Sequence, residues 1–145
     1  MTGGRYGSQH TKQHDPVLGI DQYEAWPYTY GMVTESSENW TTQLRKGIPE
    51  LCILNALSQS RRYGYEIVRA LSEIESLVVS EGTIYPILNR FKREALVQTT
   101  IEESPDGPPR KYYELTDKGR TQLSWMNDHW QRLVHGIENL RKELA

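Results

Sequence analysis

Basic and polar side chains gather between residues 80 and 93, in a segment whose apolar residues recur at helical spacing. Asparagine can pair with adenine, arginine with guanine, and lysine with phosphate, so such a helix is suited to the major groove of DNA. The members of this cluster are Asn89, Arg90, Lys92 and Arg93. Taken alone, a charge cluster is more often a solvated helix face, and the neighbouring elements decide between the two interpretations.

The start of the same segment is suited to phosphate. Ser80 and Thr83 are small hydroxylic residues at a predicted helix N-terminus, where free backbone N–H groups favour an anion and small side chains allow it to approach. Tyr85 follows them, and we expect it to be an exposed aromatic hydrogen-bond donor.

A second pair of basic residues, Arg110 and Lys111, follows two consecutive prolines. At the base of a rigid hairpin, such residues can clamp the DNA backbone or the minor groove. The alternative is that they are cross-strand partners of Glu102 and Glu103. The pair Arg61-Arg62, which precedes a predicted helix, is a further candidate for phosphate contact.

The sequence has no constellation typical of an enzyme, a metal site or a cofactor site. It contains no phosphate-cradling glycine loop and no nucleophile motif. Two of the histidines, His129 and His135, are six residues apart and so do not share one helix face. Cys52 is the single cysteine and lies on an apolar helix face, which is typical of a buried, inert thiol. We therefore expect no enzyme activity, no cofactor and no metal.

The residues around the basic cluster predict the elements that position it. Apolar spacing predicts helices over residues 49–58, with a short helical lead-in from residue 41, over 64–75, and from the N-cap Ser80 to about residue 95. Alternating residues predict strands over 97–101 and 110–115, and the Pro- and Gly-rich residues 104–109 predict the loop between them. The order of three helices, a hairpin and a final helix is that of a winged helix-turn-helix, with the third helix in the major groove.

Thr116 is a predicted N-cap for a long final helix that carries an apolar seam with 3-4-3-4-3-4 spacing. The seam consists of Leu123, Met126, Trp130, Leu133, Ile137, Leu140 and Leu144. A heptad seam of three repeats on a terminal helix favours pairing with a second copy of the chain. The alternative is that the helix packs on the core of its own domain.

The fold class is therefore mainly α with a small β-hairpin, a winged helix-turn-helix followed by a long C-terminal dimerisation helix. We expect an irregular or disordered arm over residues 1–40, a DNA-binding domain over 41–115 and the dimerisation helix over 116–145. The arm carries a net charge of −3 and the remaining residues about +1, so DNA affinity must depend on local clusters. Met32 is an alternative start position. No apolar run approaches the ~20 residues of a membrane span and the N-terminus has no signal-peptide core, so a cytoplasmic location is expected.

Several stretches together resemble the PadR family of transcriptional regulators. Residues 44–47, 50–54 and 63–67 are similar to the opening of that family's domain. The family's recognition-helix signature is similar to Ser80-Glu81-Gly82-Thr83-Ile84-Tyr85, and its wing is similar to Pro108-Pro109-Arg110-Lys111-Tyr112-Tyr113 with Gly119 soon after. The resemblance runs from about residue 43 to residue 140, and the single C-terminal helix is similar to the smaller PadR subfamily.

The resemblance implies a homodimeric repressor that binds an inverted repeat in a promoter and is released by a small molecule or another signal. It implies DNA contacts at Ser80, Thr83, Tyr85, Asn89, Arg90, Lys92, Arg93, Arg110 and Lys111, and a backbone contact at Tyr65. The partners expected are double-stranded DNA, a second copy of the chain and a small-molecule effector. Trp125 and Trp130 are the candidate residues for stacking a flat effector, although Trp130 lies in the seam and seam aromatics are more often packing residues.

Three features depart from the family pattern. Ala95 stands where a glycine usually follows the recognition helix, so we expect no left-handed cap there. Pro49 lies within what is usually an uninterrupted first helix, and the arm has no clear family counterpart. The alternative function is a ligand-sensing or protein-interaction module whose winged helix does not read DNA, favoured by the near-neutral charge and the acidic arm.

Overall fold

The computed structural model describes residues 14–15, 20–21, 35–75, 77 and 79–144. The chain divides into two units, Met1–Glu38 and Asn39–Ala145. In the first unit, β1 (His14–Asp15) pairs antiparallel with β2 (Ile20–Asp21). The rest of the predicted irregular arm, including Met32, lies outside the described residues. The arm prediction was too long at its C-terminal end, because a helix already begins at Glu35.

Two helices replace the predicted lead-in and first helix. α1 (Glu35–Leu44) and α2 (Ile48–Ala56) are separated by a short turn. Pro49 lies in the first turn of α2, where its missing N–H costs no helical hydrogen bond, and its side chain is buried. The proline therefore starts α2 rather than interrupting it.

The next two helices form the helix-turn-helix. α3 (Gly64–Ser72) is shorter than predicted, and its first turn is capped by the Glu66 carboxylate, which accepts a hydrogen bond from the Tyr63 backbone N–H at 3.1 Å. α4 (Glu81–Arg93) follows with Ser80 as N-cap, as the sequence predicts.

The end of α4 corrects the prediction for Ala95, which adopts a left-handed conformation with φ of 57°. The Leu96 N–H donates to the Phe91 carbonyl at 2.9 Å and the Ala95 N–H donates to the Lys92 carbonyl at 3.1 Å. This is the Schellman arrangement, in which Leu96 and Phe91 also belong to the same apolar core. The two satisfied carbonyls and the burial of Leu96 in the core hold alanine in a conformation that normally favours glycine.

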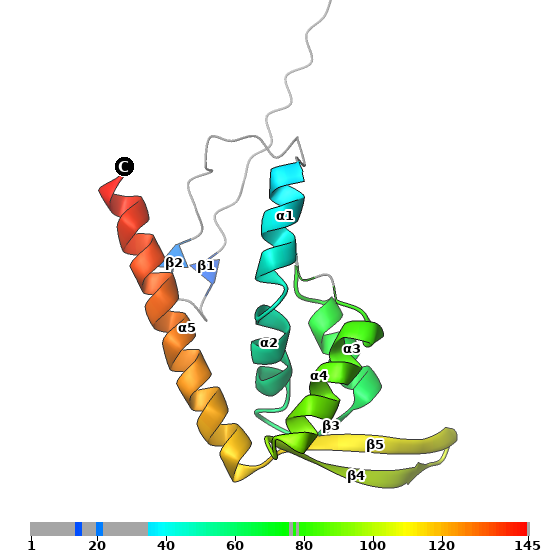
Figure 1. Cartoon of the computed structure of the whole chain (residues 1–145). Coiled ribbons are helices and arrows are strands. Elements are labelled where there is room, and N and C mark those ends of the chain that lie inside the picture. Colours follow the sequence, from blue (N-terminus) through cyan, green and yellow to red (C-terminus); the bar gives the residue numbers. More distant parts are fainter. Residues whose placement is uncertain (1–13, 16–19, 22–34, 76, 78, 145) are drawn as a thin grey trace, which may run out of the picture. The chain divides into compact units, whose positions relative to one another are not determined.

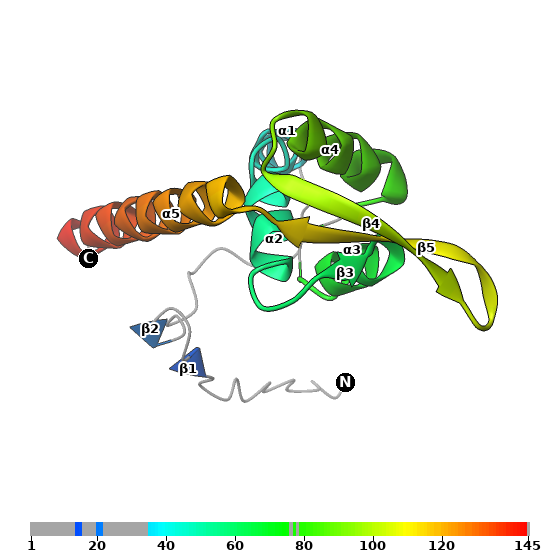
Figure 2. The same ribbon diagram turned by 90° about the horizontal axis from the view of Figure 1, so that it is seen from below.

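The β-sheet has three strands in the order β3-β5-β4, all antiparallel (Figures 1 and 2). They are β3 (Arg62–Tyr63), β4 (Val97–Ser104) and β5 (Gly107–Leu115). β3 was not predicted, because residues 60–63 lie between two predicted helices and show no apolar alternation. The predicted loop over 104–109 was also wrong, since Ser104 pairs with Gly107 and the turn is shorter. The prolines are tolerated in β5 because the register shifts there, between Glu102 and Ser104 on the partner strand.

One apolar core holds the second unit together. Its members come from α2, α3, α4, the sheet and the start of α5 (Asp117–Glu143). Each of the three helices contributes a fully buried isoleucine to this core: Ile53 from α2, Ile67 from α3 and Ile84 from α4. The core fixes the orientation of α4 against α2 and α3, so the exposed face of α4 is also fixed.

α5 starts at a tight junction with the end of α4. Thr116 caps α5, since its Oγ1 accepts a hydrogen bond from the Gly119 N–H at 3.0 Å and donates one to the Ala95 carbonyl at 2.5 Å. A β-carbon on Gly119 would lie 2.0 Å from the Leu96 carbonyl oxygen, so only glycine permits this approach. In Figure 2 the C-terminal end of α5 and the tip of the β4–β5 hairpin project from opposite sides of the helices. Within the described parts of the chain, no helix has the length and apolar character needed to cross a membrane.

Candidate nucleic-acid interface

α4 separates buried and exposed side chains onto opposite faces. Ile84, Leu88 and Phe91 are buried in the core. Asn89 and Arg93 are exposed, and their four-residue spacing places them one turn apart on the side of α4 away from the core. These two residues are therefore placed to reach base edges when the helix lies in a major groove.

The N-terminal turn of α4 is open to an anion. Ser80 and Thr83 are both exposed, and the Ser80 side chain makes no capping hydrogen bond to the helix. Lys92 is also exposed, near the other end of the helix. The structure therefore leaves hydroxyl groups accessible at the start of α4 and an ammonium group accessible near its end.

Arg90 differs from its neighbours. Its Nη2 forms an ion pair with Oε1 of Glu50 on α2, and its guanidinium lies 5.5 Å from the centre of the Phe91 ring. Arg90 therefore ties α4 to α2, a role that the sequence did not predict.

Tyr85 is not the exposed donor that was expected. It is partly buried against the first residue of α3, and a β-carbon on Gly64 would lie 2.5 Å from the Tyr85 hydroxyl oxygen. Burial raises the pKa of Tyr85, with a smaller contribution from the negative charge of Glu81. Burial also raises the pKa of Tyr113, with a smaller effect from Tyr85, so both phenols stay protonated at neutral pH. Tyr65 is 57% exposed, as a backbone contact requires.

The β4–β5 hairpin is the wing, and its basic residues pack on aromatic rings. The Arg110 guanidinium lies 4.7 Å from the centre of the Tyr63 ring, and Lys111 Nζ lies 5.7 Å from that of Tyr113. A groove of about 360 Å³ runs between the wing and the starts of α3 and α4, with Tyr65, Arg110 and Lys111 among its lining residues. The groove therefore combines a cationic wing with an exposed tyrosine, a combination suited to a phosphate backbone.

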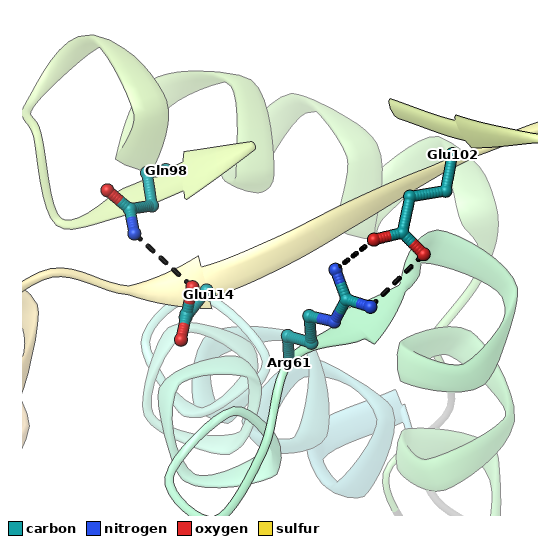
Figure 3. Close-up of polar contacts among 4 residues, drawn as sticks. All are labelled: Arg61, Gln98, Glu102 and Glu114. Atoms are coloured by element: carbon teal, nitrogen blue, oxygen red, sulfur yellow. Dashed lines mark hydrogen bonds and ion pairs between the residues drawn. The ribbon is translucent and has the colours of Figure 1, made fainter. Parts of the chain in front are cut away.

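The pair Arg61-Arg62 is occupied within the protein. Arg61 binds both carboxylate oxygens of Glu102, and Figure 3 shows this fork. The hydrogen bonds that Arg61 donates to the Glu102 carboxylate raise the pKa of the Arg61 guanidinium. Arg62 Nε donates to the Ala56 carbonyl at 2.7 Å. The pair expected to contact phosphate therefore makes contacts within the protein: Arg61 reaches β4, and Arg62 reaches back to the end of α2.

The apolar seam of α5 divides into two parts. Leu123 is 7% exposed and packs in the core of its own domain, and Met126 packs against that core. The distal residues are exposed although they are large and apolar. They are Leu133 (50%), Ile137 (48%), Leu140 (62%) and Leu144 (84%).

Trp125 and Trp130 line a second cavity, of about 200 Å³, between α5 and the start of α2. Its walls are almost entirely apolar, with Ile48 and Leu51 opposite the tryptophans. Trp125 stacks on His129, with ring centres 5.2 Å apart and planes 13° apart. The two candidate effector residues are thus brought to one apolar site.

Cys52 is partly buried, and desolvation raises the pKa of its thiol. In the described part of the chain, no three His, Cys, Asp or Glu residues are grouped as metal ligands.

Sequence reasoning missed the contacts that hold the interface together. Glu50, which binds Arg90, had no signal in the local pattern, since the contact joins two helices distant in sequence. β3 has two residues and no alternating pattern of its own, so the sequence held no signal for the contacts of Arg61 and Tyr63.

Comparison with known proteins gives one consistent family. Residues 53–125 match the family described as "Transcriptional regulator PadR-like family". The chain is 43% identical to a PadR-like transcriptional regulator of known structure from Bacillus cereus, covering 68% of this chain and 95% of that one with a TM-score of 0.62. It is 39% identical to a PadR-like transcription factor from Bacteroides fragilis, covering 70% and 98% with a TM-score of 0.59.

Two curated sequences are also similar. Uncharacterized protein X of Lysinibacillus sphaericus is 30% identical over 95 residues, which are 64% of this chain and 87% of that protein. The transcriptional regulator YqjI of Escherichia coli is 29% identical over 85 residues, 57% of this chain, but the match spans 38% of YqjI.

Proposed function

The chain belongs to the PadR-like family of transcriptional regulators, and from this premise we propose that it is a homodimeric repressor that binds an inverted-repeat promoter site. Membership of the family makes it a DNA-binding regulator with a winged-helix fold. The repressor role, the dimer and the residues that touch DNA are the proposal.

The observation that carries the proposal is the exposed face of α4 beside a basic wing. Asn89 and Arg93 point away from the core, while Arg110 and Lys111 line the groove next to the start of the same helix. With α4 in a major groove, the two α4 side chains read base edges and the wing cations contact the flanking backbone. Ser80, Thr83, Lys92 and Tyr65 add backbone contacts around them. Arg90 contributes by holding α4 against Glu50, and Tyr85 by bracing α3.

The dimer is supported by the distal seam of α5. The exposed apolar residues from Leu133 to Leu144 would be in water in an isolated chain, and a second α5 would bury them at heptad spacing. We therefore assign residues 41–115 to DNA binding and 116–145 to dimerisation. A two-fold dimer predicts half-sites whose centres are about 34–36 Å apart.

Release by an effector is supported by the cavity beside Trp125 and Trp130. Its apolar walls and stacked rings suit a flat aromatic compound. The cavity adjoins the seam residue Leu133, so an occupant would act where the two copies meet.

The test is footprinting of the purified protein on DNA recovered by selection from genomic fragments. We expect a two-fold symmetric protected site and, in a reporter assay, higher transcription when the protein is absent. A protein that binds its recovered fragments no better than random duplex at moderate salt would instead support the alternative, a sensing or interaction module that does not read DNA.

A further inference from the structure

Glu102 and Arg110 face each other across the wing but do not pair. The strand register places them directly opposite one another, on β4 and β5 respectively. Opposite charges in such a position normally attract. In this structure Glu102 is bound by a different arginine.

That arginine is Arg61, the residue immediately before β3. Its Nη1 binds Oε1 of Glu102, and its Nη2 donates to Oε2 at 3.1 Å (Figure 3). The sheet order is β3-β5-β4, so Arg61 crosses the central strand to reach Glu102. The Arg61 guanidinium lies 4.5 Å from the centre of the Tyr112 ring on the central strand β5, a cation–π contact. Both carboxylate oxygens are therefore occupied by a bidentate pair.

Arg110 takes another partner. Its guanidinium lies over the Tyr63 ring, which is itself packed edge-on against Tyr112 with ring centres 5.8 Å apart. Among the residues that the structure describes, no carboxylate lies within ion-pair distance of Arg110. A guanidinium on an aromatic face keeps its N–H donors at the ring's edge, where a phosphate can accept them.

We propose that Arg61 is a positioning residue for DNA binding, which occupies Glu102 and thereby keeps Arg110 available for a phosphate. Without Arg61, the Glu102 carboxylate captures the arginine opposite it and removes one cation from the DNA-binding surface. This inference rests on the proposed function, since it needs the wing to contact DNA. It makes the contribution of Arg110 to DNA binding depend on a residue that need not touch DNA.

The experiment measures how much Arg110 contributes to binding in different backgrounds. Arg110→Gln is made in the wild-type chain, in Arg61→Gln and in the double variant Arg61→Gln/Glu102→Gln. The probe is a duplex selected from random-sequence DNA with the wild-type protein, and its affinity is measured against salt concentration. In the wild type, losing Arg110 should lower affinity about tenfold or more and reduce the salt slope by about one phosphate contact. In Arg61→Gln the same change should cost little, and in the double variant the full cost should return.

Glu114 provides the matched control for long-range charge. Glu114 lies on the same face of β5 as Arg110. Its carboxylate accepts a hydrogen bond from Gln98 Nε2 at 3.2 Å (Figure 3). Glu114→Gln removes one negative charge, as Glu102→Gln does, but Glu114 is not the residue opposite Arg110. In the Arg61→Gln background, Glu114→Gln should therefore not restore the contribution of Arg110. Equal restoration by both would show a general charge effect and overturn the inference.

Two further outcomes separate this inference from the proposed function. If Arg110→Gln weakens binding equally in all three backgrounds, the wing binds DNA as proposed but Arg61 does not act through Glu102. If Arg110→Gln has no effect in the wild type, or no duplex is selected, both the wing contact and the inference fail. Thermal unfolding of each variant verifies that a loss of affinity is not a loss of folded protein.

Discussion

The Tyr85 hydroxyl occupies the space where a side chain on Gly64 would begin. A β-carbon there would lie 2.5 Å from Tyr85 Oη and 2.8 Å from Cε1. The contact joins the first residue of α3 to the first half of α4, the two helices of the DNA-binding motif. Their relative orientation therefore depends on a residue without a side chain.

We predict that Gly64→Ala destabilises the protein by about 1–3 kcal/mol, because the tyrosine ring must move within a packed region. Denaturant unfolding measures the change. Gly47→Ala is the control, since no atom lies within 4 Å of its would-be β-carbon. Adding Tyr85→Leu to Gly64→Ala should recover part of the loss, and equal losses for the two alanine variants would contradict the steric explanation.

We predict that Leu140→Lys prevents dimerisation while leaving the domain folded. Leu140 is 62% exposed in the isolated chain, so the substitution costs no core packing. Burying such a side chain in a dimer contributes about 1.5–3 kcal/mol per copy, and a lysine reverses this. Sedimentation velocity should show a monomer with unchanged helical circular dichroism. Gln131→Lys, on the same helix but off the seam, should remain a dimer; a dimeric Leu140→Lys would disprove the assigned interface.

We predict that Arg93→Ala weakens binding to the selected operator, whereas Lys142→Ala at the end of α5 does not. Arg93 is exposed on the face of α4 opposite the core, and Lys142 lies in the last turn of α5. Removing a base-reading arginine should weaken binding by about 1–3 kcal/mol and relax the preference at one base pair, in a selection repeated with the variant. Unchanged affinity and unchanged base preference in Arg93→Ala would contradict the proposal that Arg93 reads a base.

We predict that Cys52 reacts slowly with iodoacetamide at neutral pH, and that its rate rises at a higher pH than for a free thiol. Desolvation raises the pKa of this thiol, so the reactive thiolate is scarce in the folded chain. The raised pKa of the Cys52 thiol also makes the free energy of unfolding depend on pH. The stability that this shift contributes is fully present below the ordinary pKa of a cysteine, and it is lost as pH rises through the pKa of Cys52 in the folded state. Cys52→Ser should flatten that part of the stability profile, and rapid alkylation at pH 7 would contradict the burial.

Local pattern predicted the helices well and the tertiary contacts poorly. Helical spacing located α2, α3, α4 and α5, because one face of each meets the core. The two residues of β3 were missed since a short strand is stabilised by its partner β5 and not by its own sequence. The prolines of the wing indicated a loop, yet a register shift in β4 allows them within a strand.

The elements that carry the candidate site were predicted, but the contacts of its side chains were not. The family resemblance and the basic cluster located α4 and the wing, but residue types could not separate Arg93, which is exposed, from Arg90, which binds Glu50. Ala95 shows the same limit for the backbone. Its left-handed conformation is held by the burial of Leu96 in the core and by two hydrogen bonds, while the alanine itself disfavours it.

The junction between α4 and α5 is held by several hydrogen bonds. Besides the Thr116 bond to Ala95, the Thr116 N–H donates to the Leu96 carbonyl at 3.1 Å and Lys118 Nζ donates to the Glu94 carbonyl at 2.7 Å. The three residues that follow α4 are thereby hydrogen-bonded to the start of α5, a 27-residue helix about 40 Å long. In the proposed dimer, a small change in the angle at which the two α5 helices cross would move the two copies of α4 apart or together. We therefore expect the half-site spacing on DNA to depend on the distal part of α5, where the two helices would meet.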